Sequence, residues 1–406
     1  MTTLAQGWQR VGAVPLLASG FRPFYLLGAL YAPLLAAGGA GAFVGIVELQ
    51  AAGGPVLWHG HEMIFGFALA IIVGTLLTAL PSWAGTPELH GAPLLGLVLL
   101  WLAGRAAFWV APWLPLRAVA SADLLLLPAL IVVLAPGLWR APNRLYRLLL
   151  PILLALFAAN LVYHAAALAG DTLEAAHALR GAVWALVVLY TLKGGVLTPI
   201  FTGNALRLLG RGEQAPFLMS LETLALGCLI ALALADLTRA TAQLNGALAL
   251  GCAVVHGVRV ARWRGWRVAD QPLLPAMHLG FAWLLFAFVL KALADLGAAV
   301  PEVAWLHAFT VGALGMMMLG LMTRVSLRHT GRALEAPTPM RVAAVLMCSA
   351  AALRLAATVH GLGSWAVTGA ALLWAAAFTV YLVRFGAVLV APSLPRGSPG
   401  VRPPSI

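Results

Sequence analysis

Two histidines and a glutamate stand close together in the stretch Trp58-His59-Gly60-His61-Glu62-Met63. Imidazole is the most common metal ligand in proteins and suits copper, zinc and iron. The stretch heads an apolar run over residues 64–80 that is long enough to cross most of a bilayer. Ionisable side chains at membrane depth are costly and by default mark a functional site. The sequence therefore points to a metal site at the head of this segment.

The spacing of the two histidines limits what they can share. Residues two apart in a regular helix point about 200° away from each other. His59 and His61 therefore do not easily share one ion unless Gly60 breaks the start of the helix. Either they serve two sites, or one is a ligand and the other orients a group, with Glu62 expected to support His59 as a hydrogen-bond acceptor. The structural alternative is two interfacial histidines beside an anchoring Trp58.

Three further histidines are candidate ligands on other expected spans. His164 lies deep in an apolar segment, where an imidazole needs a polar partner, so it is either hydrogen-bonded structure or a ligand. His307 heads a later span, in which Ala308 and Gly312 are small enough to allow close helix approach. His278 lies at the cytoplasmic start of the preceding span, after Pro275, and is a weaker candidate.

The basic segment from Arg324 to Arg332 has two interpretations. Arg324, Arg328 and His329 are either the ordinary basic loading of a cytoplasmic loop, or a site for anionic groups such as cofactor propionates or lipid headgroups. Arg22 is expected on the same side of the membrane and has the same two interpretations.

Lys291 and Asp295 stand four residues apart on one expected span. Mutual neutralisation inside the bilayer is the simplest account of this spacing. A proton route through the two side chains is the alternative.

The composition sets the class of protein. The chain has 406 residues, is 62% hydrophobic and only 9% charged, whereas soluble domains carry about 25% charged residues. Backbone groups in lipid must be satisfied internally, so spans are helices or closed barrels. The long Leu- and Ala-rich runs lack the alternation of barrel strands. We therefore predict an all-α integral membrane protein.

The net charge of +12 fits basic cytoplasmic loops better than nucleic-acid binding. The three cysteines form no CxxC pair, which argues against thiolate metal sites. The sequence has no P-loop, no dinucleotide-binding glycine motif, no haem-attaching CxxCH and no Ser-His-Asp order. The absence of these motifs argues against a nucleotide-driven transporter and against a soluble-type hydrolase.

About twelve spans of roughly 20 residues each are expected, forming a polytopic bundle and a single transmembrane domain over residues 1–406. The expected spans are 22–46, 60–80, 92–112, 120–138, 147–169, 179–200, 217–236, 244–261, 275–298, 305–325, 341–360 and 364–388. Inspection of the sequence shows no convincing internal repeat.

The distribution of arginine predicts the orientation. With a cytoplasmic N-terminus, the arginine-rich loops fall inside, together with Arg10, Arg396 and Arg402 near the two ends, so both termini are predicted to be cytoplasmic. The arginines in the expected outer loops are Arg117, Arg180 and Arg239. This orientation places several ionisable side chains in the outer half of the membrane, namely His59, His61, Glu62, Asp123, His164, Lys291, Asp295 and His307.

Several strings resemble the NnrS family of bacterial membrane proteins and run from the first expected span to the tenth. They are Gly20–Leu27, Trp58–Phe67, Leu76–Gly85, Thr198–Leu206 and His307–Arg332. The Trp-His-x-His-Glu string and the Met-Thr-Arg-Val-Ser-Leu-x-His-Thr-Gly-Arg string are specific. The arginine that usually follows the Phe-Thr pair in the family is Gly203 here, which weakens an anion role for that loop.

The resemblance implies a multi-pass protein of the bacterial cytoplasmic membrane that contains copper and haem, with b-type haem expected. It implies a link to nitric oxide metabolism and to protection against nitrosative stress. Nitric oxide, or a species derived from it, is the expected partner, and the sequence does not identify an electron donor. The histidines in the matching strings, His59, His61, His307 and His329, are then the expected ligands or ligand supports.

Two other functions use the same residues. A nitric oxide reductase with a haem–metal pair would need protons and electrons, for which Glu62, Lys291 and Asp295 are suited. A transporter would use the polar groups as a route for a metal or metabolite, and broken helices would favour it. Gly194 and Gly195 are the one hint of such a break.

Overall fold

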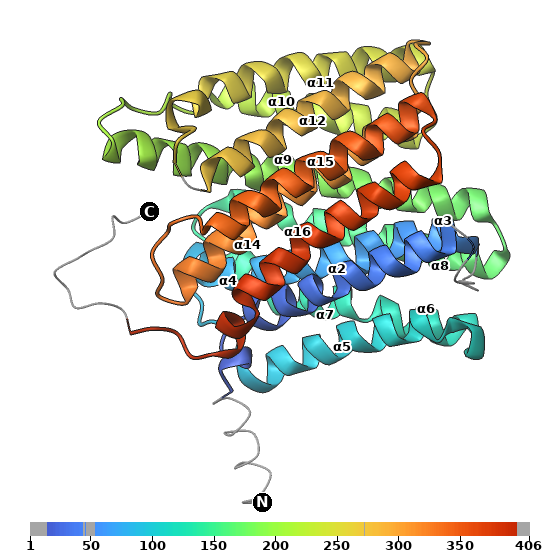
Figure 1. The fold of residues 1–406 in the computed structure, drawn as a ribbon, viewed down its shortest axis with the longest axis horizontal. Coiled ribbons are helices and arrows are strands. Elements are labelled where there is room, and N and C mark those ends of the chain that lie inside the picture. Colours follow the sequence, from blue (N-terminus) through green and yellow to red (C-terminus); the bar gives the residue numbers. More distant parts are fainter. Residues whose placement is uncertain (1–13, 44, 46–52, 272, 396–406) are drawn as a thin grey trace, which may run out of the picture. The chain divides into compact units, whose positions relative to one another are not determined.

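The computed structural model describes residues 14–43, 45, 53–271 and 273–395, and all regular elements in this part are helical (Figure 1). Twelve helices of the described part are long and apolar enough to cross a membrane. The prediction of an all-α, multi-pass membrane protein is therefore confirmed. Arg10, Arg396 and Arg402, which entered the orientation argument, lie outside the described residues.

The chain forms two compact units. The first contains the described residues up to Leu186 together with Phe378–Ser393, and the second contains Val187–Ala377 together with Leu394. The helices α9 (Thr172–Leu208) and α16 (Ser364–Val390) contribute to both units. The single transmembrane domain stays a prediction.

The first unit is built from the N-terminal helices. They are α2 (Phe21–Phe43), α3 (Gly54–His61), the π-helical segment η2 (Glu62–Ala68), α4 (Leu69–Ala84), α5 (Gly91–Trp109), α6 (Leu116–Leu124), α7 (Leu126–Arg140) and α8 (Leu149–Ala169). α3, η2 and α4 together form one continuous span, and α6 and α7 form another. α2 packs along α4, while α5 packs against α6. Large aromatic and aliphatic side chains fill the space between these helices.

Arg22 ties the start of α2 to the end of α16. Its guanidinium donates hydrogen bonds to the carbonyl oxygens of Leu389, at 2.8 Å, and Ala391, at 2.7 Å, and to Ser393 Oγ at 2.9 Å. The last carbonyls of a helix have no donor within the helix, so a buried end needs donors from elsewhere. These contacts favour a structural role for Arg22 over an anion site.

Arg22→Met is expected to lower the free energy of unfolding by about 1–3 kcal/mol, because buried carbonyls at the end of α16 lose their donors. Thermal unfolding in detergent micelles measures the change. Arg140→Met is the matched control, since Arg140 is an exposed arginine at the end of α7. An Arg22 variant as stable as the Arg140 variant would contradict the structural role.

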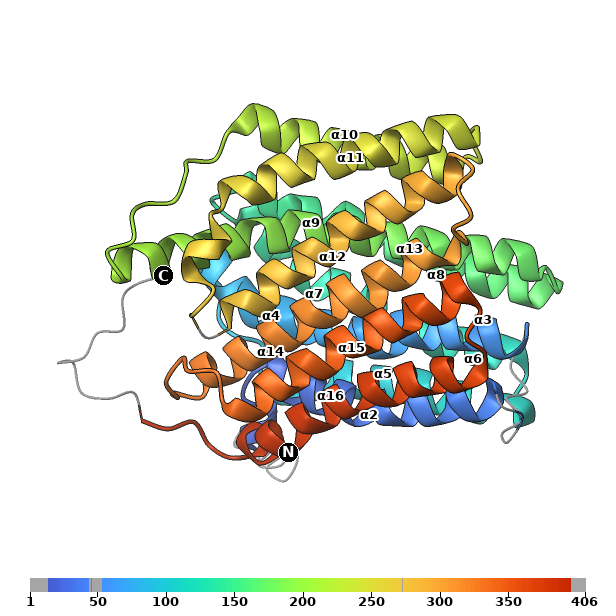
Figure 2. The ribbon, with the colours of Figure 1, turned by 45° about the horizontal axis from the view of Figure 1, so that its top comes forward.

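The second unit contains the remaining spans. They are α10 (Met219–Leu237), α11 (Ala242–Arg262), α12 (Leu274–Asp295), α13 (Val303–His307), the π-helical segment η6 (Ala308–Leu314), α14 (Gly315–His329) and α15 (Thr338–His360). α11 packs against both α10 and α12, and the three run side by side in Figure 1 and Figure 2. α12 also packs against η6 and α14.

Gly194 and Gly195, the hint of a broken helix in the sequence, do not interrupt α9, because the helix continues through both. Pro199 has no N–H, so the carbonyl of Gly195 loses its donor within the helix. Arg259 of α11 donates to that carbonyl and to the carbonyl of Thr191, both at 3.3 Å. Gly195 has no side chain, and a Cβ there would collide with the guanidinium. The glycine therefore admits a stabilising side chain rather than breaking the helix.

Lys291 and Asp295 form the expected ion pair, with Nζ 2.9 Å from Asp295 Oδ2. The lysine is buried and lies 2.7 Å from Asp236 Oδ1 of α10, a partner that the sequence did not indicate. Its ammonium group also lies 5.4 Å from the centre of the Trp305 ring. The contacts agree with mutual neutralisation, and a proton route through these residues stays a prediction.

Candidate metal centre

His61 and Glu62 stand where α3 gives way to the π-helical segment η2. Both side chains are completely buried, whereas His59 is exposed. The two histidines therefore face different surroundings, as helix geometry predicts. π-helical segments are rare and occur frequently at functional sites. The carbonyl of Gly66 in this segment accepts a hydrogen bond from Trp101 Nε1 at 3.0 Å.

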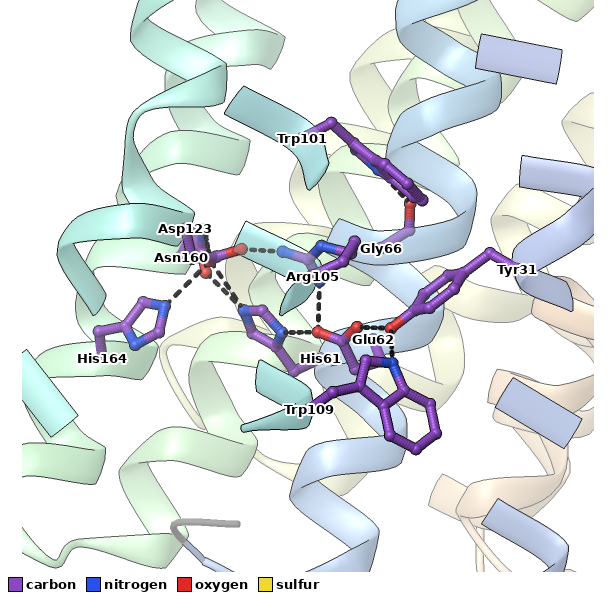
Figure 3. A network of polar contacts seen from close by, with 10 residues as sticks. All are labelled: Tyr31, His61, Glu62, Gly66, Trp101, Arg105, Trp109, Asp123, Asn160 and His164. Carbon is purple, nitrogen blue, oxygen red and sulfur yellow. Dashed lines mark hydrogen bonds and ion pairs between the residues drawn. The ribbon is translucent and has the colours of Figure 1, made fainter. Parts of the chain in front are cut away.

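Both ring nitrogens of His61 have oxygen neighbours (Figure 3). Nδ1 lies 3.1 Å from Glu62 Oε1. Nε2 lies 2.9 Å from Asn160 Oδ1 and 3.2 Å from Asp123 Oδ2. The ring is stacked on Phe108, with centroids 4.1 Å apart, so its orientation is fixed by packing as well.

Glu62 is held from two sides. It accepts hydrogen bonds from the hydroxyl of Tyr31 in α2 and from Arg105 in α5. Trp109 Nε1 in turn donates to the Tyr31 hydroxyl at 3.0 Å. The expectation that Glu62 supports His59 is wrong, because in the structure its carboxylate contacts His61, Arg105 and Tyr31. The change of helix geometry at η2 turns the carboxylate toward the interior.

Asp123 of α6 is the second buried acid. It accepts hydrogen bonds from Arg105, from Asn160 Nδ2 at 2.7 Å and from His164 Nε2 at 3.0 Å. Asn160 and His164 are four residues apart on α8 and therefore lie on the same helix face. Arg105 bridges Asp123 and Glu62, as Figure 3 shows. One arginine thus serves two buried carboxylates.

The cluster requires one more positive charge. Glu62 and Asp123 carry two negative charges when ionised, and Arg105 supplies one positive charge. Hydrogen bonding gives the same result, because the amide of Asn160 turns its oxygen to His61 while its nitrogen donates to Asp123. Both nitrogens of His61 therefore face oxygens that accept, and a neutral imidazole carries a proton on only one of them. The other nitrogen needs a further proton or a metal cation.

The donor set fits a metal ion. His61, Asp123 and His164 each offer one ligand atom, all within 4.8 Å of one another, and all three side chains are buried. In a tetrahedral site with bonds of about 2.0 Å, neighbouring ligand atoms lie about 3.3 Å apart. The observed 3.0 and 3.2 Å to Asp123 Oδ2 are close to that separation. The Glu62–His61 contact has the form of a carboxylate that orients a ligating histidine.

The same place does not fit haem. The cavity beside His164 has a volume of about 20 Å³, room for one water-sized molecule. Sites for larger cofactors have volumes of about 300–1,000 Å³. Apart from Tyr163 and His164, the residues that line the cavity are apolar, Phe108 and Leu116 among them. The cavity therefore suits a small uncharged molecule.

The other expected site residues lie elsewhere. His307 is in the second unit and hydrogen-bonds through Nδ1 to the carbonyl of Val303 at 3.0 Å. His278 Nε2 forms a hydrogen bond with Thr202 Oγ1 at 2.8 Å, so this histidine has a structural partner. The C-terminal part of α14 carries Arg324, Arg328 and His329.

Arg324 has a distinct environment among these residues. Its guanidinium lies 3.7 Å from the centre of the Phe201 ring, a favourable cation–π arrangement. Arg328 and His329 are exposed. The anion role of Arg324 and Arg328 and the ligand role of His329 stay predictions.

Sequence reasoning missed Arg105, Asn160 and Tyr31 as members of the cluster, and noted Asp123 only for its depth. One signal was present, because an arginine in the middle of the span 91–109 needs a buried polar partner, either an acid or a backbone carbonyl. The identity of that partner depends on how α5, α6 and η2 pack, which local spacing does not reveal.

The fold and the cluster define a class, a multi-pass α-helical membrane protein with a buried acid–imidazole centre. The chain matches the family model described as NnrS protein over residues 15–393, nearly its whole length. The chain therefore belongs to the NnrS family. No match was found among curated proteins.

Proposed function

We propose that the chain is a haem- and copper-binding protein of the bacterial cytoplasmic membrane that acts in nitric oxide metabolism and the nitrosative-stress response. Copper is held by His61, His164 and Asp123. The observation that carries the proposal is the position of His61, whose two ring nitrogens both face accepting oxygens. A copper ion beside Nε2 supplies the positive charge that the buried cluster requires.

The ligand set favours copper among the available metals. Imidazole suits copper, and divalent copper forms the most stable complexes of the first-row series. Calcium and magnesium prefer ligand sets made of oxygen atoms alone. The set here contains two imidazole nitrogens and one carboxylate oxygen. Copper is also the metal that the resemblance described in the sequence analysis implies.

The surroundings of His164 favour a small neutral ligand. The adjoining cavity admits one water-sized molecule and is lined mainly by apolar side chains. Nitric oxide is small, uncharged and soluble in lipid, so it reaches such a cavity without a polar channel. Bound copper would supply an electron-accepting centre to which nitric oxide coordinates.

The residues around the ligands keep them in place. Glu62 fixes the orientation of the His61 ring through Nδ1, and the Tyr31 hydroxyl and Arg105 hold Glu62. Arg105 also compensates part of the charge of Asp123. Such outer contacts typically change metal affinity by 10- to 100-fold when removed.

Haem is part of the proposal, but it is held away from the small cavity beside His164.

The direct test is the cofactor content of the full chain purified in detergent. We expect close to one copper per chain by mass spectrometry, haem by its pyridine haemochromogen spectrum, and a change in the copper signal on anaerobic addition of nitric oxide. His59→Ala is expected to retain the copper, because His59 is exposed and outside the donor set. Protein that binds no copper, even after reconstitution with Cu(I) or Cu(II), would sink the proposal.

A further inference from the structure

Two arginines of α14 have no acidic partner and no hydrogen-bond acceptor in the described part of the chain. Arg324 is half-buried, and its guanidinium lies 3.7 Å from the centre of the Phe201 ring. Arg328 stands one helical turn further along and is exposed. Neither side chain forms a hydrogen bond or an ion pair with a residue that the structure describes. A guanidinium has N–H donors and no acceptor, so both side chains present donors that these residues leave unused.

The spacing of the two arginines makes this arrangement costly. Arg324 and Arg328 are four residues apart and are therefore neighbours on one helix face, where like charges destabilise a helix. Partial burial adds to the cost, because Arg324 loses part of its hydration without gaining an oppositely charged partner. The ring of Phe201 offsets part of this cost through a cation–π contact. An anion between the two guanidiniums would remove the repulsion and would supply the missing acceptors.

The position of the pair along its span suits an anion at the membrane surface. The span Val303–His329 has 27 residues and is therefore about 40 Å long, close to the thickness of a bilayer with its headgroups. Arg328 is next to the last residue of the span, and Arg324 lies about 7.5 Å inside it. A long arginine side chain reaches from that depth toward the headgroups.

The span that contains the pair repeats an earlier span of the chain. The span with His61 and the span with His307 share six identities at a constant separation of 246 positions, for example from 61 to 307. The pairs are Pro55 and Pro301, His61 and His307, Gly66 and Gly312, Gly74 and Gly320, Gly85 and Gly331, and Pro93 and Pro339. The apolar residues between these positions differ, which hid the repeat from inspection of the sequence alone.

The helices follow the same repeat. α3 ends at His61 and α13 ends at His307, and a π-helical segment of 7 residues follows each, Glu62–Ala68 and Ala308–Leu314. π-helical segments are rare. Two of them at matching positions identify the two spans as structurally equivalent.

The packing of each π-helical segment is repeated too. An added Cβ on Gly66 would lie 2.8 Å from Cε1 of Tyr31, and an added Cβ on Gly312 would lie 2.6 Å from Cδ2 of Trp283. Each copy therefore places an aromatic ring of a neighbouring helix against the equivalent glycine. The first copy can thus be compared with the second, position by position.

The first copy has no charge where the second has its two arginines. The residues 246 positions before Arg324 and Arg328 are Thr78 and Ser82. Their hydroxyl groups donate to backbone carbonyls of their own helix, Thr78 at 2.7 Å and Ser82 at 2.8 Å. The same helical arrangement forms in the first unit without charges at these positions. The arginines therefore serve something other than the packing of the span.

We propose that Arg324 and Arg328 bind a phosphate group at the membrane surface. The planar fork of a guanidinium matches pairs of phosphate oxygens, and charge-assisted hydrogen bonds of this kind are the strong ones. Two forks one helical turn apart can share the several oxygens of one phosphate, whereas a carboxylate has only two oxygens. The phosphate belongs either to an anionic lipid headgroup or to a small soluble phosphate compound. This site goes beyond the proposed function, because it involves neither the copper ligands nor nitric oxide.

The test is isothermal titration calorimetry of the full chain in detergent with two probes, phosphatidylglycerol in mixed micelles and inorganic phosphate. Arg324→Gln combined with Arg328→Gln is expected to lower the affinity for the bound probe by at least about tenfold, because charge-assisted hydrogen bonds are lost. Arg328→Gln alone changes an exposed residue, so it should fold normally, and it is expected to lower the affinity by about threefold.

Arg140→Gln combined with Arg144→Gln is the matched control, because it removes the same charge at the same spacing from two exposed arginines of the first unit. It is expected to bind both probes as the unmodified chain does. Thermal unfolding midpoints show whether each variant is folded, and Arg328→Gln decides the matter if the double variant is not.

The two probes distinguish the source of the phosphate. Loss of affinity for phosphatidylglycerol alone supports a lipid headgroup, and loss for both probes supports a soluble phosphate compound. An unmodified chain that binds neither probe overturns the proposal. Variants of Arg324 and Arg328 that bind as the unmodified chain does overturn it as well. An equal loss in the Arg140 and Arg144 control would show general attraction to basic surface and would also overturn it.

Discussion

Arg105→Met is expected to lower the free energy of unfolding by about 3–5 kcal/mol, the cost of removing one partner from a buried ion pair. The substitution keeps most of the apolar stem but leaves Glu62 and Asp123 buried without the guanidinium that bridges them. Thermal and denaturant unfolding of the full chain in detergent, together with the yield of folded protein, measure the effect.

Two variants make the Arg105 result specific. Arg117→Met removes an exposed arginine of α6 and is expected to change stability by less than about 0.5 kcal/mol. Glu62→Gln combined with Arg105→Met removes one of the two uncompensated charges and should recover part of the loss. Equal stability of Arg105→Met and Arg117→Met would contradict the account of the buried network.

His61→Ala is expected to lower copper affinity by more than about 100-fold, because loss of a ligand exceeds the 10- to 100-fold typical of outer contacts. The substitution also removes the imidazole partner of Asn160 Oδ1, whereas Asp123 Oδ2 keeps its contact with His164. Competition with a chromophoric copper chelator measures the affinity of the purified chain.

The neighbouring histidine provides the comparison for this experiment. His59→Ala alters an imidazole two positions away that is exposed and is expected to leave the affinity within a factor of two. Asp123→Asn keeps the size of the side chain and removes one charge, so an intermediate loss is expected. If His59→Ala weakens copper binding and His61→Ala does not, the assignment of the two histidines is reversed.

Much of the fold could be predicted because a bilayer imposes strong physical limits. Continuous apolar runs give the twelve spans, since helices are the structures that satisfy their backbone in lipid without alternating polarity. The ends were less accurate, as α9 runs over Thr172–Leu208 where 179–200 was expected. A hydropathy profile does not predict that the helix continues past Pro199. The continuation is stabilised by Arg259, which donates to the carbonyl of Gly195 in place of the missing backbone N–H.

The candidate site was predicted in part. The period of the helix separated His59 from His61, and burial cost made His164 a candidate, because both arguments are local. Glu62 was assigned to the wrong histidine because sequence spacing assumed a regular α-helix, whereas a π-helical segment starts at Glu62. Arg105 joins Glu62 and Asp123 across three elements, and such a contact depends on helix packing that spacing along the chain does not encode.

The most direct test of the copper centre is X-ray absorption at the copper edge of the purified, copper-loaded chain. The account predicts a shell of nitrogen and oxygen ligands near 2.0 Å, with the outer-shell scattering of two imidazoles that falls to one in His164→Ala. A first shell of sulfur ligands, or imidazole scattering that is the same in His164→Ala as in the unmodified chain, would contradict copper ligation by His61, Asp123 and His164.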